Sequence, residues 1–117
     1  MKTSSKKAKG RKLQNDVRDL LLNKFPILEN DDIRTAVMGE SGEDIKLSPA
    51  AQKIIPLSFE CKNQERLNIW SSLEQAEDNC NGRVPVLIFK RNRSKTYITI
   101  KFDNFLNMIG DKIEIHR

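Results

Sequence analysis

The sequence predicts an α/β fold in which a mixed central β-sheet is flanked by helices. Two segments, 13–25 and 68–82, space their apolar residues as amphipathic helices do. Two others, 84–90 (VPVLIFK) and 96–102 (TYITIKF), are rich in the β-branched and aromatic residues that favour strands. Because such segments alternate along only 117 residues, we expect one domain with helices on the faces of one sheet.

The first helix is expected to follow a basic tail. Its apolar stripe consists of Leu13, Val17, Leu20, Leu21 and Phe25, and Pro26 ends it. The chain has 21 basic and 16 acidic residues, and removing the first twelve leaves 15 basic and 16 acidic. We therefore predict a flexible basic tail over 1–12 and a single domain over 13–117. The tail is either a solvated end or an arm that contacts phosphates.

Three short strands are expected next, arranged as a meander. They cover 31–38 (DDIRTAVM), 44–48 (DIKLS) and 54–62 (IIPLSFECK), with the bend GESGED before the second. PAAQK, between the last two strands, is a turn or one loose helical turn. If these last two strands pair antiparallel, Asp44 lies close to Glu60 or Lys62.

The C-terminal half adds a helix, two strands and a third helix. The apolar stripe of the helix over 68–82 contains Ile69, Leu73, Ala76 and Cys80, with Gly82 as its stop. The turn RNRS joins the two strongest strands, and the third helix covers 103–110. We expect the remainder, with the lone His116, to be a polar end without a catalytic role.

The triplet Glu60-Cys61-Lys62 ends a strand. Since a strand repeats every two residues, Glu60 and Lys62 emerge from one face. Alone, this pattern is most simply a surface salt bridge. With Asp44 nearby, the two carboxylates and the backbone carbonyl of Cys61 offer the oxygen ligands that Mg²⁺ prefers, and Lys62 can orient or deprotonate an attacking water. These are the parts that phosphodiester hydrolysis needs.

The wider string GEDIKLSPAAQKIIPLSFECKNQERLNIWSSLEQAEDN resembles the PD-(D/E)XK nuclease superfamily. It looks most like small phage endonucleases of that group that resemble archaeal-type Holliday junction resolvases. The likeness runs from about Gly10 to Leu106. It implies a restriction-endonuclease-like core and a role in DNA recombination or repair.

The resemblance also assigns roles to individual residues. It makes Asp44 and Glu60 ligands of Mg²⁺ or Mn²⁺, gives the attacking water to Lys62, and lets Gln75 support the site or the scissile phosphate. One departure concerns the first helix, where junction resolvases carry a glutamate that joins the metal site. Here Gln14 stands at about that place, and Glu40 or Glu43 beside the bend could compensate.

Contacts with DNA are expected from basic and polar residues around this site. They are Lys9, Arg11, Lys12, Gln14, Arg34, Ser41, Lys90, Arg91 and Arg93. Arg34 could instead pair with Asp31 or Asp32, and the basic turn could be a solvated face. Trp70 is a core or dimer-contact residue, or it stacks on a base.

We expect a metal-dependent endonuclease that acts on branched or four-way DNA as a homodimer, with apolar surface on the second helix or last strands making the contact. The alternatives are a nicking or flap-type nuclease without junction preference, and a non-catalytic DNA-binding module. No apolar run is long enough for a bilayer, and residues 1–12 lack a secretory signal. Cys61 and Cys80 are expected to be reduced thiols. These features predict the cytoplasm, that of the host cell if the protein is viral, and no membrane partner.

Overall fold

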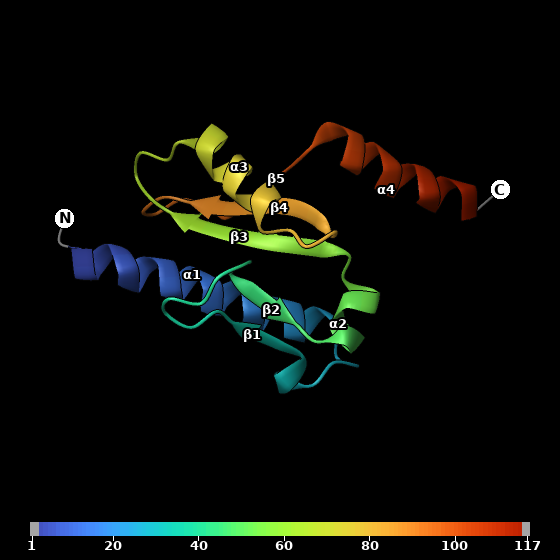
Figure 1. The fold of residues 1–117 in the computed structure, drawn as a ribbon, viewed down its shortest axis with the longest axis horizontal. Coiled ribbons are helices and arrows are strands. Elements are labelled where there is room, and N and C mark those ends of the chain that lie inside the picture. The colour runs from blue at the N-terminus through green and yellow to red at the C-terminus, as the bar shows by residue number, and fades with distance from the viewer. Residues whose placement is uncertain (1–2, 116–117) are drawn as a thin grey trace.

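A three-stranded sheet separates two helical layers in the computed structural model, which describes residues 3–115 (Figure 1). Its strands, in spatial order, are β3 (Leu57–Asn63), β4 (Val84–Lys90) and β5 (Tyr97–Ile100). β3 and β4 are parallel and β4 and β5 are antiparallel, so the sheet is mixed as predicted. Helix α1 (Thr3–Lys24) packs on one face, and α3 (Ile69–Asp78), which connects β3 to β4, packs on the other. The predicted α/β class, compatible with a restriction-endonuclease-like core, is confirmed.

The predicted three-strand meander is wrong. β1 (Ile33–Thr35) and β2 (Ile45–Leu47) form their own antiparallel pair, and β3 pairs with β4 instead. Between β2 and β3 the chain turns into helix α2 (Pro49–Ile54), whose first turn is capped by the Ser48 side chain. The pair is preceded by a short 3-10 helix, η1 (Asn30–Asp32).

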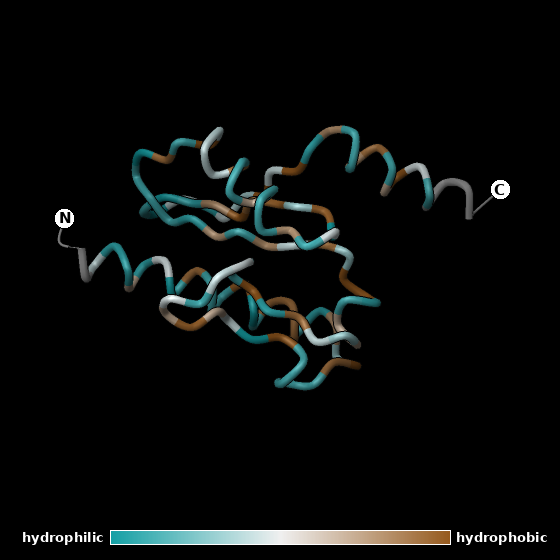
Figure 2. Tube along the Cα trace, viewed as in Figure 1, coloured by the Kyte–Doolittle hydropathy of each residue, from teal (hydrophilic) through white to brown (hydrophobic). Residues whose placement is uncertain are grey.

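Helix α1 begins at Thr3, ten residues before the predicted start. The stretch predicted as a flexible tail is therefore helical from residue 3 onward. Its lysines, arginine and alanine are good helix formers, and extending an existing helix costs far less than starting one. Figure 2 shows these first turns as mostly hydrophilic, and no described helix is long and apolar enough to cross a membrane.

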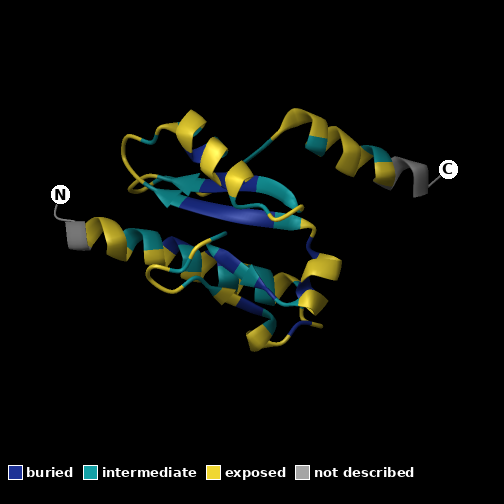
Figure 3. Cartoon of the chain, viewed as in Figure 1, coloured by how far each residue is buried: buried dark blue, intermediate teal, exposed yellow. Residues whose placement is uncertain are grey.

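The main core lies between α1, the β1–β2 pair and one face of the sheet. Its fully buried members include Leu13, Ile33, Ile45 and Val86, and Figure 3 shows buried segments along β3. Leu20 was predicted to belong to the apolar stripe of α1, but it is 65 % exposed. The residues of α1 that contact the core are instead spaced four apart: Leu13, Val17, Leu21 and Phe25.

The C-terminal elements differ from the prediction in length and burial. Helix α4 (Phe102–Ile115) is longer than predicted, and His116 lies outside the described residues. Trp70 on α3 is 79 % exposed, which excludes the core role. In Figure 1, α4 extends away from the sheet and from α3.

Candidate active site

Strand β3 carries the predicted acid and amine. Phe59 and Cys61 belong to the main core beneath α1, so strand alternation turns Glu60 toward the α3 side of the sheet. The Nζ of Lys62 lies 4.0 Å from Oε1 of Glu60, which places both side chains together as predicted. Because seven residues of β3 pair with β4, the backbone that holds this pair is fixed in register.

Asp44 reaches β3 from the bend that precedes β2. Gly42 has a φ of +92°, a conformation that side-chain-bearing residues rarely adopt, and it turns the chain toward the sheet. The Asp44 N–H donates to the Phe59 carbonyl (3.0 Å), and Asp44 Oδ2 accepts from the Cys61 N–H (2.7 Å). These contacts hold Asp44 beside Glu60 without the predicted antiparallel ladder.

Glu60 is a buried carboxylate with an incomplete set of partners. Its residue exposure is 2 %, and its Oε2 is buried without a hydrogen-bond donor among the described residues. Burial, followed by the negative charge of Asp44, raises the pKa of Glu60 to about 7, against an ordinary value of 4.5. Two adjacent carboxylates with an unsatisfied oxygen repel each other, and a bound cation would relieve that repulsion.

The donor set fits a hard divalent cation. Burial raises the pKa of the Cys61 thiol, so the thiol stays protonated and only its backbone carbonyl is a candidate ligand. The hydrogen bond to Cys61 occupies one oxygen of Asp44 and leaves the other for a cation. No group of three metal-binding acid, Cys or His side chains occurs in the part of the chain that the structure describes. Two carboxylates, a carbonyl and water suit Mg²⁺, which usually keeps several waters.

The two acids suggested as substitutes for a first-helix glutamate are engaged elsewhere. Arg34 donates to both oxygens of Glu40 (3.0 and 2.9 Å), and these bonds lower the pKa of Glu40 to about 2. Glu43 is buried, with Arg83 at 3.5 Å and Lys46 at 3.8 Å. Protein cations therefore already neutralise both acids. Gln14 is half-buried on α1, one turn after Gly10.

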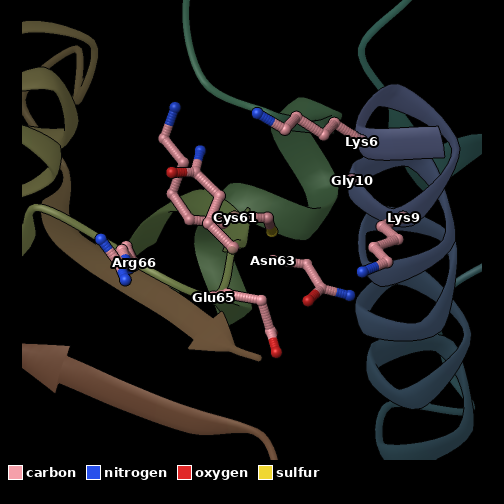
Figure 4. A pocket seen from close by; sticks show the side chains of 9 residues that line it. Lys6, Lys9, Gly10, Cys61, Asn63, Glu65 and Arg66 are labelled. Atoms are coloured by element: carbon pink, nitrogen blue, oxygen red, sulfur yellow. The ribbon is translucent and has the colours of Figure 1, made fainter. Parts of the chain in front are cut away.

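A cleft of about 570 Å³ opens at the end of β3 beside this site (Figure 4). Its walls are Lys6, Lys9 and Gly10 of α1 together with residues 61–66. In Figure 4 the two α1 lysines face Cys61 and Asn63 across the cleft. A second hollow, of about 270 Å³, shares Gln64 and Glu65 with the first and is also lined by Lys90 and Arg91. The two adjoining hollows thus place lysines and arginines on both sides of the chain segment that follows Lys62.

The structure distributes the other predicted DNA-contact residues over two further areas. Arg11 and Lys12 are exposed on α1, where Lys12 pairs with Asp16 at 3.0 Å. Arg34 and Ser41 lie near the bend; Arg34 pairs with Glu40 rather than with Asp31 or Asp32, and the Ser41 carbonyl accepts from Lys46. Arg93 is exposed in the turn after β4, with a positive φ of 62°.

Two residues near the site, Asn79 and Lys6, are not among those that the sequence motifs identify. On α3, Gln75 is exposed, whereas the Asn79 side chain, one turn later, contacts Glu60 and favours its charged form. The available sequence signal is Ala76 on the predicted apolar stripe, because residue 79 lies three positions later on the same face of the helix. Lys6 was included in the tail but not among the DNA contacts. It lies one turn before Lys9, and that spacing signals a shared face once the segment is known to be helical.

One comparison with known protein families gives a match over most of the chain. A family model described as "Phage putative PDDEXK endonuclease" matches residues 5–117, nearly the whole chain. No curated protein and no solved structure gives a significant match. The match includes α1 from its first turns, so the helix that lines the cleft lies within the shared region. The chain therefore belongs to this family of phage PD-(D/E)XK endonucleases.

Proposed function

We propose that the protein is a divalent-metal-dependent DNA endonuclease selective for branched DNA, with the four-way junction as its preferred substrate. In this proposal it acts as a homodimer in the cytoplasm of the host cell. The observation that carries the metal dependence is the unpartnered Oε2 of Glu60 beside Asp44. A buried acid in that state gains most from a cation, whether Mg²⁺ or Mn²⁺.

Each residue of the site has a distinct part in the proposed hydrolysis. Asp44 and Glu60 hold the cation, with the Cys61 carbonyl as the third protein oxygen. When bound, the cation supplies Lewis-acid activation of the phosphate and of the attacking water. Lys62, held 4.0 Å from Glu60, orients that water or accepts its proton. Asn79 keeps Glu60 directed toward the site, while Gln75 is the candidate for a longer contact to the phosphate.

The cleft supports binding of a DNA backbone on both sides of the cut. Lys6 and Lys9 line one wall, and Lys90 and Arg91 line the adjoining hollow. Cys61 and Lys62 line the first hollow and connect it to the two carboxylates, so these cations match a strand that enters along α1 and leaves along the end of β4. Selectivity for junctions is the most specific part of the proposal. It is supported by the resemblance of the motif string to junction resolvases.

The test is cleavage of three DNA substrates: a four-way junction, a flap and a plain duplex. Each is incubated with Mg²⁺, Mn²⁺ or EDTA, and compared with Asp44→Asn and Lys62→Ala. Asp44→Asn keeps an acceptor for the Cys61 N–H, so loss of activity reports on charge. Lys53→Ala, an exposed lysine on α2, and Asp19→Ala, an exposed acid on α1, are matched controls.

The expected result is metal-dependent cutting of the junction that both site variants lose and both controls keep. Cleavage that survives Asp44→Asn and Lys62→Ala would refute the site. Equal cutting of all three substrates would remove junction selectivity and leave a nicking or flap-type nuclease. Junction binding without cutting under either metal would indicate a non-catalytic DNA-binding module.

A further inference from the structure

Helix α4 presents a row of large apolar side chains to solvent. Phe102 is 68 % exposed, Phe105 and Leu106 are 44 % and 43 % exposed, and Met108 and Ile109 are each 39 % exposed. Positions 102, 105, 106 and 109 follow the i, i+3, i+4, i+7 spacing of a single face. Figure 2 shows the alternation of apolar and polar residues along this helix. Among the described residues, α4 packs extensively against no other helix or strand.

An apolar groove lies between α3 and β5. It has a volume of about 290 Å³, and its apolar lining includes Trp70, Leu73, Ala76, Pro85 and Ile100. Trp70 stands 79 % exposed at this groove. A groove that leaves a tryptophan this open is incomplete as a core and suited to receive an apolar helix face.

The chain's own α4 is poorly placed to fill this groove. β5 ends at Ile100 and α4 begins at Phe102, so Lys101 alone connects them. Reversing a chain onto the element before it takes a longer loop. In Figure 1 the helix continues outward from the end of β5, away from α3. The apolar face of α4 and the groove therefore belong to the same chain, but the short connection prevents the helix from packing into the groove of its own chain.

We propose that two copies of this chain exchange their C-terminal helices, so that α4 of each copy lies in the α3–β5 groove of the other. Such an arrangement has twofold symmetry, because each copy gives one helix and receives one. This helix exchange would form the interface of the homodimer proposed above. The argument for it uses only the apolar surfaces of α4 and the groove.

The area available is that of a specific dimer. The exposed side chains of α4 and the groove offer about 600–800 Å² of mainly apolar surface on each copy, given roughly 150–250 Å² for a whole aromatic side chain. Reciprocal burial then removes about 1,200–1,600 Å² from water, the standard size of a stable protein–protein interface. The described acids of α4, Asp103 and Asp111, make an anionic membrane surface a poor alternative occupant.

The first test measures mass and tryptophan emission without DNA or metal, so a failure of the proposed nuclease activity does not affect it. Sedimentation equilibrium should give twice the chain mass of 13.5 kDa. Trp70 is the only tryptophan, so dilution below the dissociation constant should shift its emission to the red. Phe105→Asp and Trp70→Ala should each raise that constant about 30-fold or more. Leu20→Asp, at an apolar site on α1 that is 65 % exposed, should leave it unchanged.

The second test separates helix exchange from helix-to-helix packing. A Phe105→Asp chain keeps an intact groove, and a Trp70→Ala chain keeps an intact helix. Mixed in equal amounts, they can form a heterodimer with one undamaged contact, so the mixture should associate more tightly than either variant alone. All three substituted positions are exposed, so the variants should fold, and circular dichroism checks this. A monomer at all concentrations, a dimer insensitive to both variants, or a mixture no tighter than its parts would overturn the proposal. A monomer that binds anionic vesicles would assign α4 to lipid instead.

Discussion

Glu43 and Glu60 are both buried, yet the balance of charge around them differs. Glu43 is 7 % exposed and is surrounded by cationic and amide groups, from Arg83, Lys46 and Asn81. Glu60 is 2 % exposed and has one cation, Lys62 at 4.0 Å, but it also faces the carboxylate of Asp44, and one of its oxygens is unpartnered. Burying a charge is costly unless an opposite charge accompanies it. Around Glu43 two protein cations supply that charge, whereas around Glu60 one lysine is set against two carboxylates, which leaves a place for a metal cation.

The comparison shows how a structural acid differs from a functional one in a single small chain. Glu43 ties the bend before β2 to residues near the start of β4, so its charge is used to hold the fold. The neighbours of Glu60 stabilise its charged form poorly, and its raised pKa reflects this. Substituting each glutamate by glutamine should therefore have opposite effects on stability and on activity.

The largest expected effect concerns cleavage. Glu60→Gln removes a charged ligand and should lower the rate of DNA cleavage about 10³-fold under saturating metal, since metal activation of water and phosphate is lost. Glu43→Gln should change the rate per folded molecule less than about threefold, because Glu43 lies among protein cations. Single-turnover cleavage, normalised to folded protein by circular dichroism, measures both. Equal losses in the two variants would abolish the distinction.

The next effect concerns folding. Glu43→Gln leaves Arg83 without its buried counter-charge, while Lys46 keeps Glu40 at 3.9 Å. We expect a loss of about 2–3 kcal/mol in the free energy of unfolding. Urea denaturation at pH 7 measures it. An exposed ion pair serves as the control: Asp16→Asn, which breaks the pair with Lys12, should cost less than about 0.5 kcal/mol. If Glu43→Gln lowered the free energy of unfolding no more than Asp16→Asn, the charge of Glu43 would not contribute to stability.

The metal-free protein should become less stable as pH rises, because of Glu60. Its folded pKa of about 7 is above the ordinary 4.5, so its contribution is fully present below about pH 4.5 and is lost as pH rises through 7. Glu60→Gln should match the wild type near pH 5. At pH 8 in EDTA it should be more stable by about 1–2 kcal/mol, after allowance for solvent screening.

Thermal unfolding at the two pH values measures this difference. Adding Mg²⁺ at pH 8 should stabilise the wild type and leave Glu60→Gln unchanged, since binding to the folded state raises stability only where a site exists. A stability difference that is the same at pH 5 and pH 8 would contradict the raised pKa.

The smallest expected effect is on DNA affinity, from substituting the lysines of the cleft near Glu60. Lys6 and Lys9 line the cleft near Glu60, whereas Lys46 is half-buried beside Glu43. Lys6→Ala and Lys9→Ala should each weaken DNA binding a few-fold and reduce the slope of log affinity against log salt by about 1. Fluorescence anisotropy with labelled junction DNA at several salt concentrations measures the slope, and Lys53→Ala provides the control. An unchanged slope would remove α1 from the DNA-binding surface.

Local pattern predicted most elements of the fold but not the pairing of its strands. The composition of residues 54–62 predicts a strand, and β3 covers Leu57–Asn63, but the partner expected for it was the strand over 44–48 rather than β4. Composition does not distinguish a parallel from an antiparallel partner. The helix between β3 and β4 was a usable signal, because a strand–helix–strand unit favours parallel pairing. The helical state of residues 3–12 was missed because lysine-rich segments form both helices and disordered tails.

What the sequence by itself determined is the relation of Glu60 to Lys62. Two residues apart on a strand, they share a face whatever the rest of the chain does, because the pleat repeats every two residues. Only the tertiary structure decided which further groups surround them. It brought Asp44 to the Cys61 N–H across 17 positions, turned Asn79 toward Glu60 and placed the lysines of α1 along the cleft. Such contacts depend on how helices pack over a sheet, which is set by the whole core rather than by any local repeat.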